Sequence, residues 1–193
     1  MKRSGIATAL VALALATAPL HGQDRGQAGR PSFPNPGPAD TQHGRSDSRS
    51  FIEEMAVVGT AEVQLGRMAA ERASDPGVKA FGQMMVTDHT QAGNELKQVA
   101  SQMSVSLPTQ LDAKHRELAD KLSKLQGSSF DREYINAMVE GHQEVAAKLR
   151  AHTGSHSASD THDAALTQWA TQALPTVERH LMRARELQQK LGK

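Results

Sequence analysis

Apolar side chains recur in steps of three and four residues through most of the chain, the spacing that places them on one face of a helix. The clearest case is 50–73, where the repeating apolar positions are Ile52, Met55, Val58, Leu65 and Met68. Comparable stripes predict further helices over 75–103, 109–126, 128–152 and 160–191, with a loop over 153–159. The pattern therefore predicts an all-α protein.

Helix start and stop signals agree with these segments. Asp75 is an expected N-cap, and Pro76 suits the first position of the helix that follows. Gly127 is expected to cap the C-terminus of the short helix over 109–126. Pro175 lies inside the last predicted helix, where it removes one backbone hydrogen bond and should produce a kink.

The predicted helices are four long ones and a short one, and the short one falls between the second and third long helices. A simple up-and-down bundle needs only tight loops, whereas a ferritin-like bundle needs a long connection at that place. The segment 109–126 with its flanks is long enough to form such a connection. We therefore predict a ferritin-like four-helix bundle with an extra short helix in the crossover between the second and third long helices.

Three regions are predicted along the chain: a signal peptide at 1–22, a disordered linker rich in Pro and Gly at 23–49, and the helical bundle domain at 50–191. Lys2 and Arg3 precede an uncharged apolar run that is shorter than the about 20 residues of a membrane-spanning helix. A cleaved signal predicts a periplasmic or secreted protein with no transmembrane segment remaining. An uncleaved N-terminal anchor is the alternative.

Composition narrows the classes of partner and chemistry. The chain has no Cys, which excludes disulfides, thiolate catalysis and a lipid anchor on Cys. Of 22 Lys and Arg, 20 remain once Lys2 and Arg3 are removed with the signal, against 21 Asp and Glu, so no nucleic-acid-binding surface is expected. Helical bundles commonly self-associate, which leaves a homo-oligomer open, and no partner protein is indicated.

Four predicted helices each place one metal-capable side chain in the middle of an apolar stripe. These residues are Glu62, His89, His142 and His180. A titratable group on a buried face is costly unless it is paired, so four such positions predict a common site in the core. Asp88 is adjacent to His89 and can support the site or supply a further ligand.

Three imidazoles and a carboxylate suit one Fe, Zn, Mn or Cu ion, and no motif for an organic cofactor is present. Di-iron sites of ferritin-like bundles use Glu-x-x-His, but Val86, Val139 and Val177 lie three residues before the histidines, which favours a mononuclear site. The competing interpretation is a non-catalytic envelope protein, structural or interacting with a partner, in which these side chains form a metal-free hydrogen-bond network. No motif predicts a particular reaction.

Several short motifs resemble one known family. In order, they are Ala61-Glu62-Val63-Gln64-Leu65-Gly66, Asp75-Pro76-Gly77-Val78-Lys79, Met85-Val86-Thr87-Asp88-His89, Phe130-Asp131-Arg132-Glu133-Tyr134 and Leu174-Pro175-Thr176-Val177-Glu178-Arg179-His180-Leu181, with His142 between the last two. Together they resemble the exported bacterial family called domain of unknown function 4142, which is similar to ferritin-like bundles. The resemblance spans about 51–187 and implies the fold and an exported location, but no settled activity.

Overall fold

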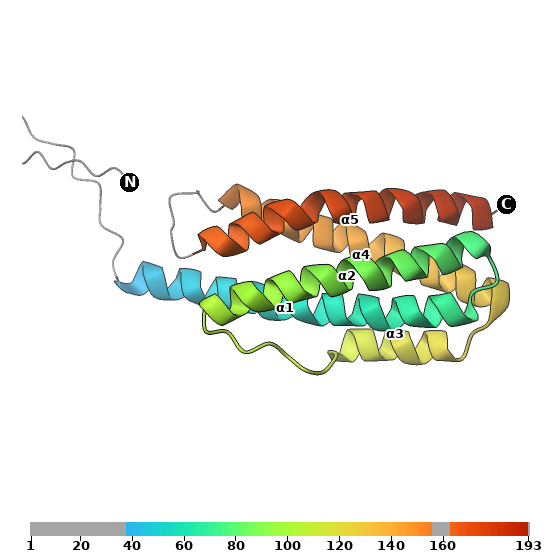
Figure 1. The fold of residues 1–193 in the computed structure, drawn as a ribbon, viewed down its shortest axis with the longest axis horizontal. Helices are drawn as coiled ribbons and strands as arrows, with labels where there is room; N and C mark the ends of the chain where they lie inside the picture. The colour runs from blue at the N-terminus through green and yellow to red at the C-terminus, as the bar shows by residue number, and fades with distance from the viewer. Residues whose placement is uncertain (1–37, 156–162, 193) are drawn as a thin grey trace, which may run out of the picture. The chain divides into compact units, whose positions relative to one another are not determined.

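The computed structural model describes residues 38–155 and 163–192. These residues form five helices and no strand: α1 (Pro38–Arg72), α2 (Pro76–Gln102), α3 (Ala113–Ser123), α4 (Gly127–Ser155) and α5 (Ala164–Leu191) (Figure 1). The predicted all-α bundle is confirmed. None of the described helices combines the length and apolar character that a bilayer crossing requires. The predicted signal peptide, the linker up to position 37 and most of the predicted 153–159 loop lie outside the described residues.

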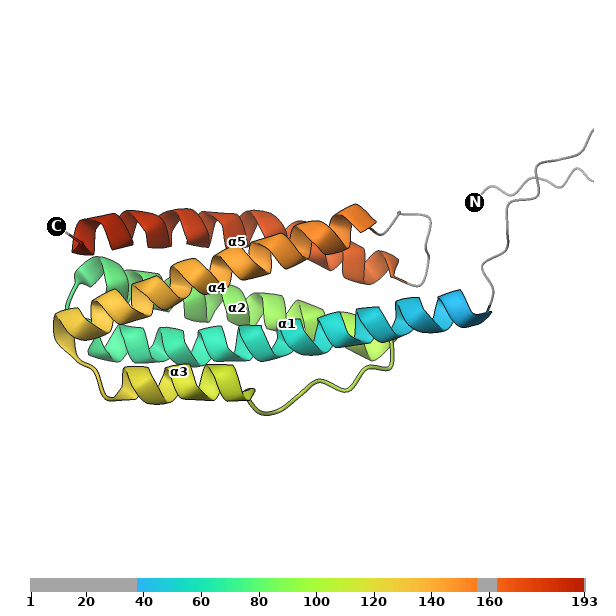
Figure 2. The same cartoon turned by 180° about the vertical axis from the view of Figure 1, so that it is seen from behind.

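The four long helices pack as two antiparallel pairs. α1 packs mainly against α2, and α4 packs mainly against α5. The connection after α2 runs back along the bundle through α3, so that α2 and α4 point in the same direction (Figures 1 and 2). The short helix therefore lies in the connection where the sequence placed it, while the likeness to ferritins stays a prediction.

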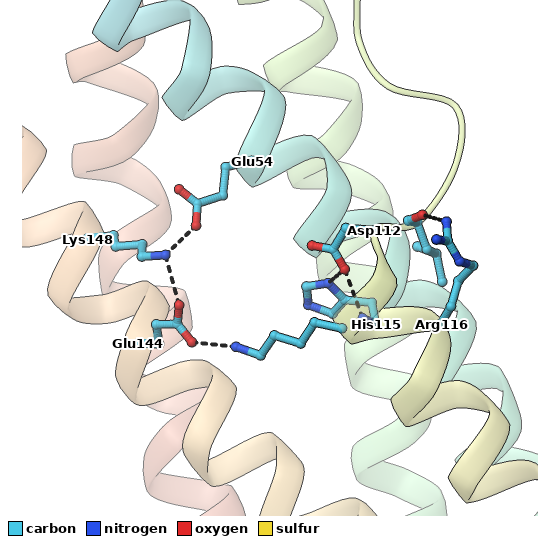
Figure 3. A network of polar contacts seen from close by, with 8 residues as sticks. Glu54, Asp112, His115, Arg116, Glu144 and Lys148 are labelled. Carbon is cyan, nitrogen blue, oxygen red and sulfur yellow. Dashed lines mark hydrogen bonds and ion pairs between the residues drawn. The ribbon is translucent and has the colours of Figure 1, made fainter.

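A chain of exposed ion pairs fixes α4 to α1 and to the start of α3. Lys148 of α4 bonds to Glu54 of α1, and it also donates to Glu144, 2.8 Å away (Figure 3). Lys114 at the start of α3 donates to the same Glu144 over 2.8 Å. Single exposed pairs contribute little, but a network of them defines where the connecting segment lies on the bundle.

The expected start of the first helix at position 50 is wrong, because α1 begins at Pro38. The segment 38–49 was assigned to the disordered linker, yet the hydroxyl of the buried Ser48 donates to the carboxylate of Asp163, 2.8 Å away at the start of α5. Composition alone gives no sign of this contact, since the two residues lie far apart in the sequence.

The turn between α1 and α2 is held by two carboxylates. Asp75 is the N-cap of α2 as predicted, accepting hydrogen bonds from the backbone of Gly77 and Val78 at 2.8 and 3.2 Å. Asp131 of α4, which is buried, accepts from the backbone N–H groups of Ser74 and Asp75 at 3.0 and 2.9 Å. A residue of the α4–α5 pair therefore holds the start of α2.

Other predicted boundaries differ by a few residues. The short helix ends at Ser123, and Gly127 begins α4 instead of capping α3. Gly127 has a φ of 59°, a left-handed conformation that glycine adopts without steric cost. α5 begins at Ala164 and continues through Pro175.

The core consists of two apolar clusters that follow one another along the bundle. The first surrounds the α1–α2 turn and includes Leu65, Phe81, Phe130, Tyr134, Ile135 and Leu181. The second lies toward the opposite end and includes Ile52, Leu96, Leu149, Leu166 and Trp169. Between the two clusters lie Glu62 on α1, Asp88 and His89 on α2, His142 on α4 and His180 on α5, so the bundle carries its polar centre at the junction of two apolar halves.

Candidate metal centre

Three histidines from three helices meet at the junction of the two core clusters. His89 of α2, His142 of α4 and His180 of α5 each offer one ring nitrogen, and these nitrogens all lie within 4.8 Å of one another. The ring centroids are separated by 5.7 Å for His89–His142 and by 5.4 Å for each of the other pairs. His142 and His180 are 2% and 1% exposed, while His89 is partly buried.

Two of the three rings are oriented by a second contact. Nδ1 of His142 lies 2.9 Å from the carbonyl oxygen of Met138, one turn earlier in α4. Nε2 of His180 lies 2.8 Å from Oδ2 of Asp88 in α2. Because both partners only accept hydrogen bonds, each of these nitrogens carries the proton, and the other nitrogen of each ring keeps its lone pair.

The nitrogens left over by those contacts are buried and have no hydrogen-bond partner. They are Nε2 of His142 and Nδ1 of His180, and Nε2 of His89 shares this condition. Native proteins satisfy nearly all buried polar atoms, so the lone pairs of these three nitrogens need an electron-pair acceptor. A metal cation can take such a lone pair, as can an O–H donor such as water, whereas a further carbonyl or carboxylate cannot.

Glu62 of α1 lies beside this trio without belonging to it. Its Oε1 is 3.9 Å from Nδ1 of His142, and a Cβ added at Gly141 would lie 3.7 Å from the same oxygen. The side chain is 6% exposed, and Oε2 has no hydrogen-bond partner. Burial raises the pKa of Glu62 to about 8, so in the absence of a cation the carboxyl is largely protonated at neutral pH.

Burial has the opposite effect on the histidines. Burial, together with the neighbouring imidazoles, lowers the pKa of His89 to about 3 and that of His142 to about 4. Burial lowers the pKa of His180, although the hydrogen bond that its Nε2 donates to Asp88 acts to raise it. Neutral imidazole is the form that binds metal, so protons compete little for these nitrogens near neutral pH.

Tyr134 and Phe81 complete the surroundings of the site. The Tyr134 hydroxyl is buried without a partner, and burial together with the nearby Glu62 raises its pKa well above the usual range. It makes no hydrogen bond to His142. The Phe81 ring, which belongs to the first apolar cluster, lies edge-on to His142 and His180, at 6.5 and 6.4 Å between centroids.

The arrangement fits a metal ion after a small adjustment. Imidazole nitrogens bind Zn at about 2.0–2.1 Å. Three nitrogens 4.8 Å apart, the upper limit here, would lie roughly 2.8 Å from their common centre, so each would move inward by roughly 0.7 Å. Rotation of the side chains covers such a distance. His89, His142 and His180 would hold the ion, with Asp88 orienting His180 and Glu62 supplying negative charge next to His142.

The fold and the site define a helical bundle with a histidine cluster at the centre of its core. The chain belongs to the family described as Domain of unknown function (DUF4142), which it matches over residues 33–187. The resemblance carried by the motifs is thereby confirmed, and the match extends over the early part of α1. No curated protein and no solved structure matches the chain.

Proposed function

We propose that this protein binds one transition-metal ion through His89, His142 and His180. The observation that carries the proposal is a cluster of three imidazoles whose ligand nitrogens lie within 4.8 Å of one another, with one buried nitrogen on each ring that has no hydrogen-bond partner. Asp88 serves as the positioning residue for His180, because a carboxylate on the far nitrogen fixes the ring and raises its basicity. Glu62 balances part of the charge of the ion.

The donor set favours Zn, Cu and Fe over Mn among the four metals considered. Imidazole suits Zn, Cu and Fe, whereas Mn prefers oxygen ligands. Three histidines leave at least one coordination position for water or another ligand, as in catalytic zinc sites. An exported location would make this a metal-handling protein of the cell envelope, and that part of the proposal rests on the apolar N-terminal run and its preceding Lys2 and Arg3.

The rival function is a scaffold in which the same side chains lock the bundle without metal. Such a network should contain hydrogen bonds between its members. Within the described residues, Glu62, His89 and His142 make none to one another, and only Asp88–His180 joins two of the predicted residues. This geometry gives less support to a metal-free lock than to a metal site.

Titration of the untagged protein with Co(II) tests the proposal, because the visible spectrum of Co(II) reports both stoichiometry and ligand geometry. We expect one equivalent per chain and competition by Zn(II). His142→Ala should weaken binding at least tenfold, whereas His115→Ala, which removes an imidazole on α3 outside the cluster, should leave it unchanged. Absence of binding, or equal binding by both variants, would refute the proposed function.

A further inference from the structure

A mostly apolar cavity of about 620 Å³ reaches the histidine cluster from the surface. Its buried end is lined by Met55, Leu96 and Trp169, all from the second core cluster. Its outer end is lined by exposed residues of α1 and α2, Gln64 and Asn94 among them. His89 also lines this cavity, so the space joins solvent to one of the proposed metal ligands.

Two glycines widen the cavity, although the packing of the helices does not require glycine at either position. Gly59 in α1 and Gly93 in α2 both line it, and a Cβ added to either would meet no atom within 4 Å. Glycine within a helix is less stable than alanine, so packing gives no reason for glycine at these two positions. What the missing side chains provide is open space.

A second pair of glycines, in contrast, lies in close contact, and it shows which residues of α1 and α2 lie level with each other. Gly66 and Gly82 lie where α1 and α2 approach most tightly, and a Cβ on either would come within 2.7 Å of the other residue's carbonyl oxygen. Gly59 lies seven residues before Gly66, and His89 lies seven residues after Gly82. In an antiparallel pair these steps of two turns run in the same direction, which places Gly59 level with His89.

We propose that this cavity, which Gly59, Gly93 and His89 all line, binds a small, uncharged and largely apolar organic molecule. Its volume lies in the range of small-molecule sites, and apolar walls with few polar groups are typical of them. Arg67 is the one lining residue with a permanent charge, and it is exposed. A charged ligand would therefore lose its hydration at the inner end without gaining a partner.

The inner end of the ligand meets the metal, and this part rests on the proposed function. A nitrogen or oxygen donor carried by the molecule would take the coordination position that three histidines leave free. The apolar body of the molecule would then occupy the space beside Met55 and Trp169.

The cavity is tested on the metal-free full-length protein with N-phenyl-1-naphthylamine, an uncharged apolar fluorophore. We expect saturable binding of one molecule per chain. Gly59→Leu and Gly93→Leu should each weaken it at least tenfold by filling the space, and Gly154→Leu, at a glycine in α4 that is also free of steric contact, should not. Circular dichroism confirms that each variant is folded. Binding that is absent from the natural chain, or equal in all four proteins, would overturn the proposal.

The contact with the metal is tested separately on the Co(II)-loaded protein with 4-phenylimidazole. We expect the visible spectrum to change in the natural chain and to stay constant in Gly59→Leu, which should still bind one Co(II). A natural chain that binds Co(II) but shows no spectral response would overturn this contact. If the natural chain binds no Co(II), the proposed function and the metal contact both fail, and the fluorophore titration alone decides whether the cavity is a ligand site.

Discussion

The two ring nitrogens of a histidine have different tasks at this site. In His142 one nitrogen bonds to the Met138 carbonyl, and in His180 one bonds to Asp88. Those contacts set which nitrogen of each ring is protonated and leave a lone pair on the other nitrogen. Rings held in this way by protein groups would lower the entropic cost of binding the proposed ion.

Loss of the Asp88 carboxylate should weaken metal binding without removing a ligand. We expect Asp88→Ala to reduce Co(II) or Zn(II) affinity by about 10–100-fold, the usual effect of removing a group that orients a metal-binding histidine. Asp88→Asn keeps an acceptor oxygen and should have a smaller effect. Competition titrations with a chelator of known affinity provide the measurement, and equal affinities for Asp88→Ala and the natural chain would contradict this role.

Glu62 should make the metal-free protein less stable as the pH rises. Its pKa is about 8 in the folded state and near 4.5 in the unfolded state, so between these values the folded state binds the additional proton and stability falls with increasing pH. The depressed pKa values of His89, His142 and His180 act in the opposite direction, up to about one pH unit above their unfolded value of 6.5.

The window from about pH 7.5 to 8, where unfolded histidines are almost fully deprotonated, therefore isolates Glu62 within this cluster. Urea unfolding should show a loss of up to about 1.4 kcal/mol per pH unit in the natural chain. Glu62→Gln, which is neutral at all these pH values, should remove most of that slope. A slope that survives the substitution would show that another group is responsible.

At the scale of single residues, the sequence singled out the residues of the candidate site but showed little of the role of each. Helical phase singled out Glu62, His89, His142 and His180 because each interrupts an apolar stripe. Phase does not specify side-chain rotamers, so it could not show that Asp88 bonds to His180 rather than to its neighbour His89. Nor could it show that Glu62 faces the protonated side of His142.

On the level of helices, substitutions in the two glycine pairs of α1 and α2 are expected to change stability in opposite directions. Gly59→Ala and Gly93→Ala should each stabilise the protein by about 0.5–1 kcal/mol, because helix propensity improves and the added Cβ meets nothing. Gly66→Ala should be destabilising, because its Cβ would lie 2.7 Å from the carbonyl oxygen of Gly82. Urea denaturation of the single variants measures both, and a stabilising Gly66→Ala would contradict the close helix contact.

Asp131 should contribute to stability through the start of α2. Replacing it by Ala would remove the acceptor for the backbone N–H groups of Ser74 and Asp75, at a cost of about 1–3 kcal/mol. Asp131→Asn keeps one acceptor oxygen and should cost less. The free energy of unfolding distinguishes the two variants, and a neutral Asp131→Ala would show that the turn is held by other contacts.

Apolar periodicity predicted which helices form, but it did not predict where several of them begin or end. α1 starts earlier than expected, and the long-range contact with Asp163 is made by Ser48, in a stretch where the sequence has no apolar stripe. α3 is shorter than its pattern, since only Ala119 and Leu122 of this helix are buried. Local pattern predicts where a helix can form, and tertiary contacts decide where it ends.

Considered as a whole, the bundle consists of two apolar halves joined at a polar centre. The sequence predicted the all-α class and the short helix of the connection, because both depend on the order and length of segments. It did not predict the division of the core into two clusters, which depends on the pairing of helices across the bundle.

Because all four long helices meet at the centre, metal binding should stabilise the entire domain. A ligand present at 100 times its Kd adds about 2.7 kcal/mol to the free energy of unfolding. We expect the melting temperature to rise with Zn(II) concentration and to return to its initial value with chelator. His180→Ala should lose this response, and a response retained in that variant would indicate a different site.

X-ray absorption spectroscopy of the zinc-loaded, untagged protein after gel filtration tests the central claim most directly. The account predicts about one zinc per chain, with three imidazole nitrogens at about 2.0–2.1 Å. Zinc that is lost during gel filtration, or that is bound by oxygen ligands alone, would contradict a metal centre built from His89, His142 and His180.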